Sequence, residues 1–343
     1  MKIGIIGTGA IANKHAQAYR NLGFEIVACS NKTEERGRQF AERWGTQFLP
    51  DYQDLCAYPG LDYVDVCTFP DSHLSVVQIC SALGRPVLVQ KPIATNLEDA
   101  REMITLTRAA GVTFGVVSQH RFDESTMFLK RAIDAGRLGK LLQADAYVKW
   151  FRSDEYYSRA IKGSWQTEGG GALINQAIHQ VDLLLYLIGS VDAVFGLWQL
   201  GARHKIESED VVNALLAYNS GSQGVIQAST AIWPGYTERI EIHGTKGSAI
   251  ISGDRLTRWD VLDDEQANRM EPAPVASDVS SGASDPMAID LAPFERQFND
   301  FADAIRSRRD PLVSGEEGYR ALSVVLAIYQ SCREQKLLAP TPL

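Results

Sequence analysis

Residues 169–182, GGGALINQAIHQVD, place three glycines directly before a stretch with helical periodicity. Asn175, His179 and Asp182 stand at i, i+4 and i+7, so we expect them on one face of a helix. Histidine exchanges a proton near neutral pH, which makes His179 a candidate general base; the alternative is a structural histidine. Glycine is costly to order, and we expect these glycines to let a ligand lie against the helix start, whose N–H groups lack intrahelical partners.

A second candidate is Lys91, in the segment VLVQKPIATNLEDA. Lys91 and Pro92 follow an apolar strand expected over residues 86–90. Open α/β sheets bind ligands at the carboxyl ends of their strands, where a lysine can stabilise negative charge that develops on a substrate. On position alone, Lys91 can equally be a solvated residue at the end of a strand.

The amino terminus carries a glycine turn, GTGAIA, between an apolar run and a helical stretch. Gly7, Gly9 and Ala12 fit the pattern GxGxxG/A, in which bare backbone approaches a pyrophosphate and the helix start binds its charge. The turn therefore predicts a dinucleotide site, and the alternative is an ordinary tight turn. The residues expected to form this part of the site are Gly7, Thr8, Gly9, Ala10, Ile11 and Ala12.

The end of the second expected strand, ACSNKTEER, bears on which dinucleotide is bound. An acidic residue there would bind the ribose 2′-OH of NAD, but this chain has none before Glu34. The hydroxyl, amide and cations at Ser30, Asn31, Lys32 and Arg36 could instead accept a 2′-phosphate, so NADP(H) is expected to be favoured over NAD(H). In the alternative, Asn31 binds the ribose of NAD and Lys32 points to solvent.

The elements that must position these groups fall into two halves. Near-continuous apolar strands at 25–30, 62–68, 86–90 and 112–118 alternate with helical patterns such as 71–83 and 96–110. This alternation predicts an α/β fold with a doubly wound parallel sheet, covered on both faces, over residues 1–120.

The pattern changes after about residue 120. Longer strands with hairpin-like spacing, such as DVVNALLAYN and QGVIQASTAIW, predict a second domain over 121–343 with a mainly antiparallel sheet. Residues 264–292 are rich in Pro, Ser, Ala and Asp and are expected to form a long loop. Two final helices are expected at 293–308 and 315–335.

Composition excludes several classes of function. A formal net charge of −8 on 343 residues argues against a nucleic-acid partner, which needs a basic surface. The five cysteines are scattered without a CxxC pair, so no metal site is expected among them. No apolar run approaches the length of a membrane span and no signal peptide is seen, so no membrane partner and a cytoplasmic location are expected.

Taken together, these motifs resemble the Gfo/Idh/MocA family, named after glucose–fructose oxidoreductase and inositol dehydrogenase. The resemblance rests on the GxGxxA turn, QKP, QHRF at 119–122, EGGGALINQAIHQVDLL and ERIEIHGTKGSA, and covers nearly the whole chain. It implies a Rossmann domain followed by an α/β domain with an open sheet whose outer face mediates homodimer or homotetramer contacts. It also implies that Lys91, Asn175 and His179 are catalytic, and that Thr68, Pro70, His73, Gln90 and Lys91 lie beside the cofactor.

Two residues depart from the family pattern. Gln90 replaces the glutamate of E-K-P, and Asn175 replaces the aspartate of D-x-x-x-H. A neutral amide cannot accept a proton, so the role of base falls on His179, helped by Lys91, and Asn175 is left to position a substrate hydroxyl or the histidine. The NQ form of the motif is familiar in sugar-oxidising branches of the family.

The substrate class is inferred from residues 149–168, KWFRSDEYYSRAIKGSWQTE, where five aromatic residues accompany basic ones. Flat aromatic faces with hydrogen-bonding groups suit a cyclic polyol or sugar; Tyr157, Trp165 and Arg121 are the expected substrate contacts beside Asn175 and His179. The expected function is an NAD(P)-dependent dehydrogenase or reductase that transfers a hydride between the nicotinamide and a secondary alcohol or ketone. The alternative is a catalytically silent NAD(P)-sensing regulatory protein of the same fold.

Overall fold

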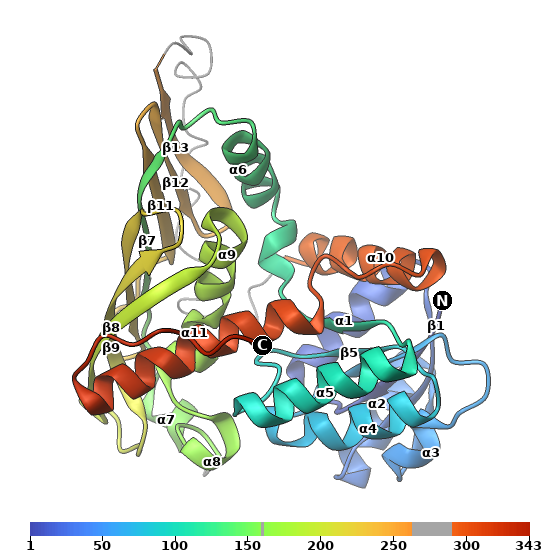
Figure 1. Cartoon of the computed structure of the whole chain (residues 1–343). Helices are drawn as coiled ribbons and strands as arrows, with labels where there is room; N and C mark the ends of the chain where they lie inside the picture. Colours follow the sequence, from blue (N-terminus) through green and yellow to red (C-terminus); the bar gives the residue numbers. More distant parts are fainter. Residues whose placement is uncertain (159–160, 263–289) are drawn as a thin grey trace. The chain divides into compact units, whose positions relative to one another are not determined.

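The computed structural model describes residues 1–158, 161–262 and 290–343, which form two compact units (Figure 1). The first unit comprises Met1–Gln119 and Asp290–Tyr319, together with Leu343. The second comprises the described residues from His120 to Leu262 and Arg320–Pro342. No helix within the described residues is long and apolar enough to cross a membrane.

The first unit is built on a six-stranded parallel sheet with the order β3-β2-β1-β4-β5-β6. The order reverses between β1 and β4, which is the point where such sheets bind ligands. The strands are short and mostly buried on both faces, as the apolar runs predicted. Their bounds are β1 (Lys2–Ile6), β2 (Glu25–Ser30), β3 (Gln47–Leu49), β4 (Tyr63–Val66), β5 (Val87–Val89) and β6 (Phe114–Val116).

Five α-helices and one 3-10 helix connect these strands. Helix α2 ends at Gly45 and α5 at Gly111, both in the left-handed conformation that glycine adopts without strain. The bounds are α1 (Ala10–Asn21), α2 (Glu34–Trp44), α3 (Tyr52–Cys56), η1 (Pro70–Ser72), α4 (His73–Ala82) and α5 (Leu97–Ala110). The doubly wound parallel sheet expected from the sequence is therefore confirmed.

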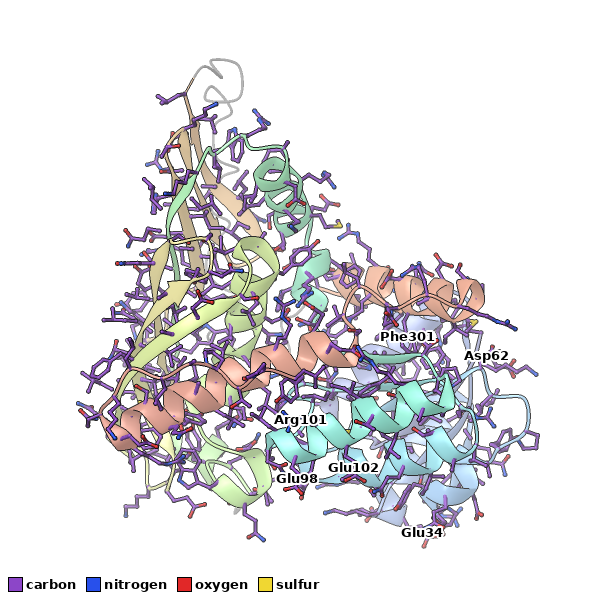
Figure 2. The ribbon with its side chains drawn as sticks, viewed as in Figure 1. Glu34, Asp62, Glu98, Arg101, Glu102 and Phe301 are labelled. Atoms are coloured by element: carbon purple, nitrogen blue, oxygen red, sulfur yellow. The ribbon has the colours of Figure 1, made fainter. Side chains whose placement is uncertain are left out.

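Helix α10 (Ala292–Ser307) belongs to the first unit, although the sequence placed it in the second domain. Its aromatic residues explain the difference. Phe298 stacks on Tyr19 with ring centroids 4.3 Å apart, and Phe301, labelled in Figure 2, meets the Tyr63 ring edge-on at 5.1 Å. The chain first leaves this unit after Gln119, and residues 290–319 return to it.

The second unit contains a seven-stranded sheet with the order β13-β12-β11-β7-β10-β9-β8. Every pairing is antiparallel except that of β10 with β7, so the expected open, mainly antiparallel sheet is confirmed. The bounds are β7 (Leu141–Lys149), β8 (Val191–Leu200), β9 (Glu209–Tyr218), β10 (Gln223–Ser229), β11 (Arg239–Gly244), β12 (Gly247–Ser252) and β13 (Arg255–Val261).

Helices α6 and α9 cover one face of this sheet (Figure 1). The helical segments of this part are η2 (Gln119–Phe122), α6 (Glu124–Asp134), α7 (Asp154–Tyr157), α8 (Trp165–Glu168), a π-helical turn η3 (Leu173–Ala177) and α9 (Ile178–Ile188). Helix α11 (Gly315–Glu334) follows α10, so both expected final helices are confirmed. The long loop expected over 264–292 falls almost entirely outside the described residues.

Candidate functional site

The turn between β1 and α1 has the geometry that a dinucleotide requires. Gly7 has a φ of +89°, and a Cβ there would meet the carbonyl oxygen of Cys67 at 2.8 Å, so glycine is needed. Gly9 is the N-cap of α1, and a Cβ there would meet nothing within 4 Å. Thr8 Oγ1 is buried without a hydrogen-bond partner in the described part of the chain. These features fit a phosphate group held by backbone N–H donors at the start of α1. Ala10, Ile11 and Ala12 are the first three residues of that helix.

At the end of β2 the four residues expected to select the cofactor differ in placement. Ser30 is 2% exposed and its hydroxyl lies 3.5 Å from the carbonyl oxygen of Pro50, so its contact with the cofactor stays a prediction. Asn31 Oδ1 accepts from Thr8 N at 3.4 Å and thereby ties the strand end to the glycine turn. Lys32 and Arg36 are exposed.

The loop after β4 is held by a buried histidine. His73 Nδ1 lies 2.9 Å from the carbonyl oxygen of Ile93, and Nε2 lies 3.4 Å from that of Thr68. Burial lowers the pKa of His73, so a neutral ring donating to Ile93 is favoured. His73 therefore connects the loop after β4 with the loop after β5. Of the other two residues expected beside the cofactor here, Thr68 is half-buried and Pro70 is the first residue of η1.

Gln90 and Lys91 follow β5 at the same edge of the sheet. The side chain of Gln90 is 7% exposed and its Nε2 lies 2.8 Å from Nε2 of His15. Its main-chain N–H donates to Val66 O at 3.0 Å, which continues the pairing with β4. Lys91 is half-buried directly after it.

In the second unit the three glycines at 169–171 lie beside a buried carboxylate, that of Glu209. Glu209, at the start of β9, accepts the N–H groups of Gly171 and Leu173, both at 2.8 Å. The hydroxyl of Tyr329 donates to the same carboxylate at 2.7 Å. The N–H groups at the start of this segment were expected to be available to a ligand. That expectation is wrong at Gly171 and Leu173, because both N–H groups donate to the carboxylate of Glu209. Burial raises the pKa of Glu209 to about 7, although its three donors oppose the shift.

Asn175 and His179 are the accessible residues of this segment. Asn175 and His179 are partly exposed, whereas the remaining residues of the segment 171–180 are all buried. Asn175 Nδ2 donates to the carbonyls of Gly170 at 3.1 Å and Gly171 at 3.2 Å, which sets the orientation of its amide. The helix therefore presents Asn175 and His179 together at one surface.

A second histidine lies against His179. The rings of His120 and His179 meet edge-on at 88° with centroids 5.0 Å apart. His120 Nδ1 donates to Asp123 Oδ2 at 2.8 Å. His120 lies within the QHRF motif, but no local spacing connects it with residue 179, so the sequence does not indicate this contact.

Asp182 and Arg121 form a buried ion pair. Arg121 Nε donates to Asp182 Oδ2 at 2.8 Å and Nη2 to Oδ1 at 2.5 Å, and the Tyr186 ring lies 4.9 Å from the guanidinium. Arg121 is 1% exposed and Asp182 is 4% exposed. Asp182 thus does not share the accessible face with His179, and the geometry favours a structural role for Arg121 over the expected substrate contact.

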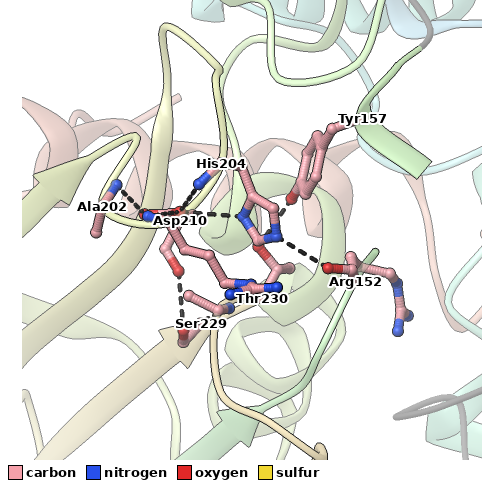
Figure 3. A network of polar contacts seen from close by, with 9 residues as sticks. Arg152, Tyr157, Ala202, His204, Asp210, Ser229 and Thr230 are labelled. Carbon is pink, nitrogen blue, oxygen red and sulfur yellow. Dashed lines mark hydrogen bonds and ion pairs between the residues drawn. The ribbon is translucent and has the colours of Figure 1, made fainter. Parts of the chain in front are cut away.

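The two expected aromatic contacts have internal partners as well. Figure 3 shows Tyr157, whose hydroxyl lies 2.8 Å from Thr230 Oγ1, beside His204. Trp165 donates from its indole to the carbonyl of Glu207 at 3.1 Å and packs against Trp198 and Tyr329. Tyr157 is half-buried and stays a predicted substrate contact. Trp165 packs in an aromatic cluster with Trp198 and Tyr329, which favours a structural role for it.

The network in Figure 3 centres on a pair that sequence reasoning missed. His204 Nδ1 lies 3.0 Å from Asp210 Oδ2, and His204 Nε2 lies 2.9 Å from the carbonyl oxygen of Arg152. Both side chains are fully buried. Asp210 also accepts the main-chain N–H groups of residues 202–204, so the pair fixes the loop between β8 and β9 rather than serving a ligand.

Comparison with known proteins agrees with both halves of the chain. Residues 1–118 match the family model described as an oxidoreductase family with an NAD-binding Rossmann fold, and residues 126–250 match the GFO/IDH/MocA C-terminal domain. Myo-inositol 2-dehydrogenase of Thermotoga maritima is 29% identical over 98% of this chain and 97% of its own. The scyllo-inositol 2-dehydrogenase (NAD(+)) of Bacillus subtilis is 26% identical over 97% and 94%.

A solved structure extends the similarity to the whole fold. The WlbA dehydrogenase of Bordetella pertussis, in complex with NADH and UDP-GlcNAcA, has a TM-score of 0.85 and 29% identity, covering 100% of this chain and 99% of its own. The chain belongs to the Gfo/Idh/MocA family of oxidoreductases with an NAD-binding Rossmann fold.

Proposed function

We propose that this oxidoreductase transfers a hydride between a nicotinamide cofactor and a secondary alcohol or ketone of a cyclic polyol or sugar. The observation that carries the proposal is the joint exposure of Asn175 and His179 on a segment that is otherwise buried. Relatives named as inositol dehydrogenases support the substrate class.

Each polar residue has a distinct part in this reaction. The nicotinamide, when bound, accepts or returns the hydride. His179 takes the hydroxyl proton, since proton and hydride must leave the same alcohol group in oxidation. Lys91 supplies positive charge for the alcohol oxygen. Asn175, whose amide nitrogen is held by two glycine carbonyls, presents the amide that positions a substrate hydroxyl.

A panel of substrates tests the proposal. Nicotinamide reduction is followed by absorbance with inositols, aldoses, glycosides and nucleotide sugars, the last because a neighbouring structure contains UDP-GlcNAcA. The proposal predicts saturable turnover with at least one of these. Binding of the reduced cofactor without turnover of any member would support a regulatory protein instead.

We propose further that NADP(H) is preferred. Lys32 and Arg36 are exposed beyond β2 with no acidic residue before Glu34, so a 2′-phosphate would meet positive charge. The similar WlbA structure contains NADH, which makes direct calorimetric titration of both cofactors decisive. Binding of NAD about tenfold tighter than NADP, about 1.4 kcal/mol, would overturn the preference.

We also propose that the chain forms a homodimer or homotetramer through its second sheet. Phe195, Leu215 and Val225 form a cross-strand row on the face opposite to the buried residues, with Leu197 beside them. Leu215 is 58% and Leu197 51% exposed, and such an apolar surface is typical of a contact between copies. Light scattering should show an oligomer that Leu215→Lys weakens; a 37.8 kDa species alone at micromolar concentration would contradict this.

A further inference from the structure

A chain of buried hydrogen bonds joins Asp65, His15 and Gln90 in the first unit. Asp65 lies on β4, His15 on α1, and Gln90 directly after β5. His15 Nδ1 lies 2.7 Å from Asp65 Oδ2, and His15 Nε2 lies 2.8 Å from Gln90 Nε2. His15 and Asp65 have no exposed surface. The chain therefore connects the interior of the unit with the sheet edge where Lys91 follows.

With the amide nitrogen of Gln90 toward the His15 ring, the polar groups of this hydrogen-bonded chain fit one arrangement of protons. The carboxylate of Asp65 can only accept, so His15 Nδ1 carries the hydrogen of that contact. The amide nitrogen of Gln90 can only donate, so His15 Nε2 accepts. His15 is thus a neutral ring in the Nδ1–H form, and its Nε2 fixes the Gln90 amide with the nitrogen toward the ring and the oxygen away from it.

A metal site is the other use that these residues suggest. Cys67 Sγ lies 3.4 Å from His15 Nδ1 and 3.6 Å from Asp65 Oδ1, so three ligand types meet. However, both ring nitrogens of His15 already have hydrogen-bond partners. Burial raises the pKa of Cys67, and metals bind the thiolate rather than the thiol. The hydrogen-bonded chain is the arrangement that satisfies all of these groups.

We propose that Asp65 and His15 are positioning residues that hold Gln90, and with it the strand end that carries Lys91, in the form that binds the nicotinamide cofactor. Gln90 stands where the family motif has glutamate. A glutamate there would place a second carboxylate against His15, and that contact needs a further proton on the ring or on the glutamate, whereas the amide matches the neutral ring. The inference rests on the proposed function only for the identity of the ligand.

The form of the His15 ring can be measured without any cofactor. Long-range 1H–15N spectra of the full-length protein, labelled at its six histidines, distinguish the two neutral tautomers and the charged ring, and His15→Asn assigns the signal. We expect the Nδ1–H form of His15 at pH 7 in the wild-type protein. A wild-type ring in the Nε2–H or charged form would overturn the proposal, as would stoichiometric metal in the purified protein.

Cofactor binding tests the positioning role. We expect His15→Asn and Gln90→Leu each to raise the NADPH and NADH dissociation constants about tenfold, and the double variant to add less than about twofold, because linked groups act as one unit. Gln78→Leu, which removes an exposed glutamine bound to Glu102, is the matched control and should bind as wild type does.

A purely structural role has a different signature. If the variants lower the melting temperature but bind both cofactors as tightly as wild type, the positioning role is overturned. Wild-type protein that binds neither NADH nor NADPH would overturn the proposed function. The tautomer measurement tests only the hydrogen bonds between Asp65, His15 and Gln90 and does not depend on the cofactor.

Discussion

The carboxylate of Glu209 accepts the main-chain N–H of Gly171 at 2.8 Å, across 38 residues of sequence. This contact explains why the helix that carries Asn175 and His179 begins with bare backbone. A Cβ on Gly171 would collide with the carbonyl oxygen of Glu209, and one on Gly170 with the hydroxyl of Tyr329. The glycines are thus required by packing within the unit, and the accessible polar surface begins at Asn175.

The first prediction concerns that packing. Gly171→Ala should destabilise the protein by about 2 kcal/mol or more, because the backbone of β9 cannot yield to the added methyl group as a flexible side chain would. Urea unfolding followed by circular dichroism measures the loss. A stability within about 0.5 kcal/mol of wild type would show that the close contact is absent.

Gly9→Ala should leave stability unchanged and weaken cofactor binding. The added Cβ meets nothing within 4 Å and the φ of −75° suits alanine, so the fold should be unaffected. The methyl group would occupy the space into which a pyrophosphate fits, so cofactor affinity should fall by about tenfold or more. Calorimetric titration with NADH and NADPH checks this, and unchanged affinity for both would place the phosphates elsewhere.

Glu209 should make stability depend on pH. Its pKa rises from 4.5 to about 7 on folding, so the folded state binds the proton more tightly than the unfolded state. The resulting stabilisation is fully present below about pH 4.5 and is lost as the pH rises through about 7, at most about 3 kcal/mol.

Glu209→Gln removes this titration. The stability of wild type relative to the variant should therefore be greater at pH 5 than at pH 8, measured by urea unfolding at both pH values. A difference that is equal at the two pH values, or larger at pH 8, would contradict the raised pKa.

The buried pair of Arg121 and Asp182 yields a prediction that separates stability from binding. Arg121→Met alone should cost about 3–5 kcal/mol, because it leaves a buried carboxylate unpaired, and adding Asp182→Leu should recover most of the loss. The double variant should keep the substrate KM within about twofold. A stable double variant with a KM raised about tenfold would restore Arg121 as a substrate contact.

The sequence predicted the elements better than their long-range partners. The apolar strands and the glycine turn after β1 were predictable because burial on both faces and a βα turn are local patterns. The pairing of Arg121 with Asp182 spans 61 residues, and the return of α10 to the Rossmann unit depends on aromatic contacts that no periodicity encodes.

The candidate site shows the same division. The spacing of Asn175 and His179 correctly indicated one accessible surface, but the i+7 position of Asp182 did not. His179 and Asp182 are one turn apart in α9, yet Asp182 is buried because its carboxylate pairs with Arg121, a long-range partner that spacing does not encode. Ser30 likewise ends a strand as expected, yet its side chain is directed inward, which residue type alone does not indicate.

The most direct test of the proposed function is the turnover of His179→Ala on the best substrate of the panel. General acid–base catalysis contributes about 10²–10⁴ in rate, so turnover should fall by that factor while cofactor affinity stays within about twofold, and Lys91→Ala should lose turnover similarly. His243→Ala, a half-buried histidine of the same unit bound to Ser248, is the matched control and should keep full activity. If His179→Ala retains more than about a third of wild-type turnover, His179 is not the base and the proposed mechanism is wrong.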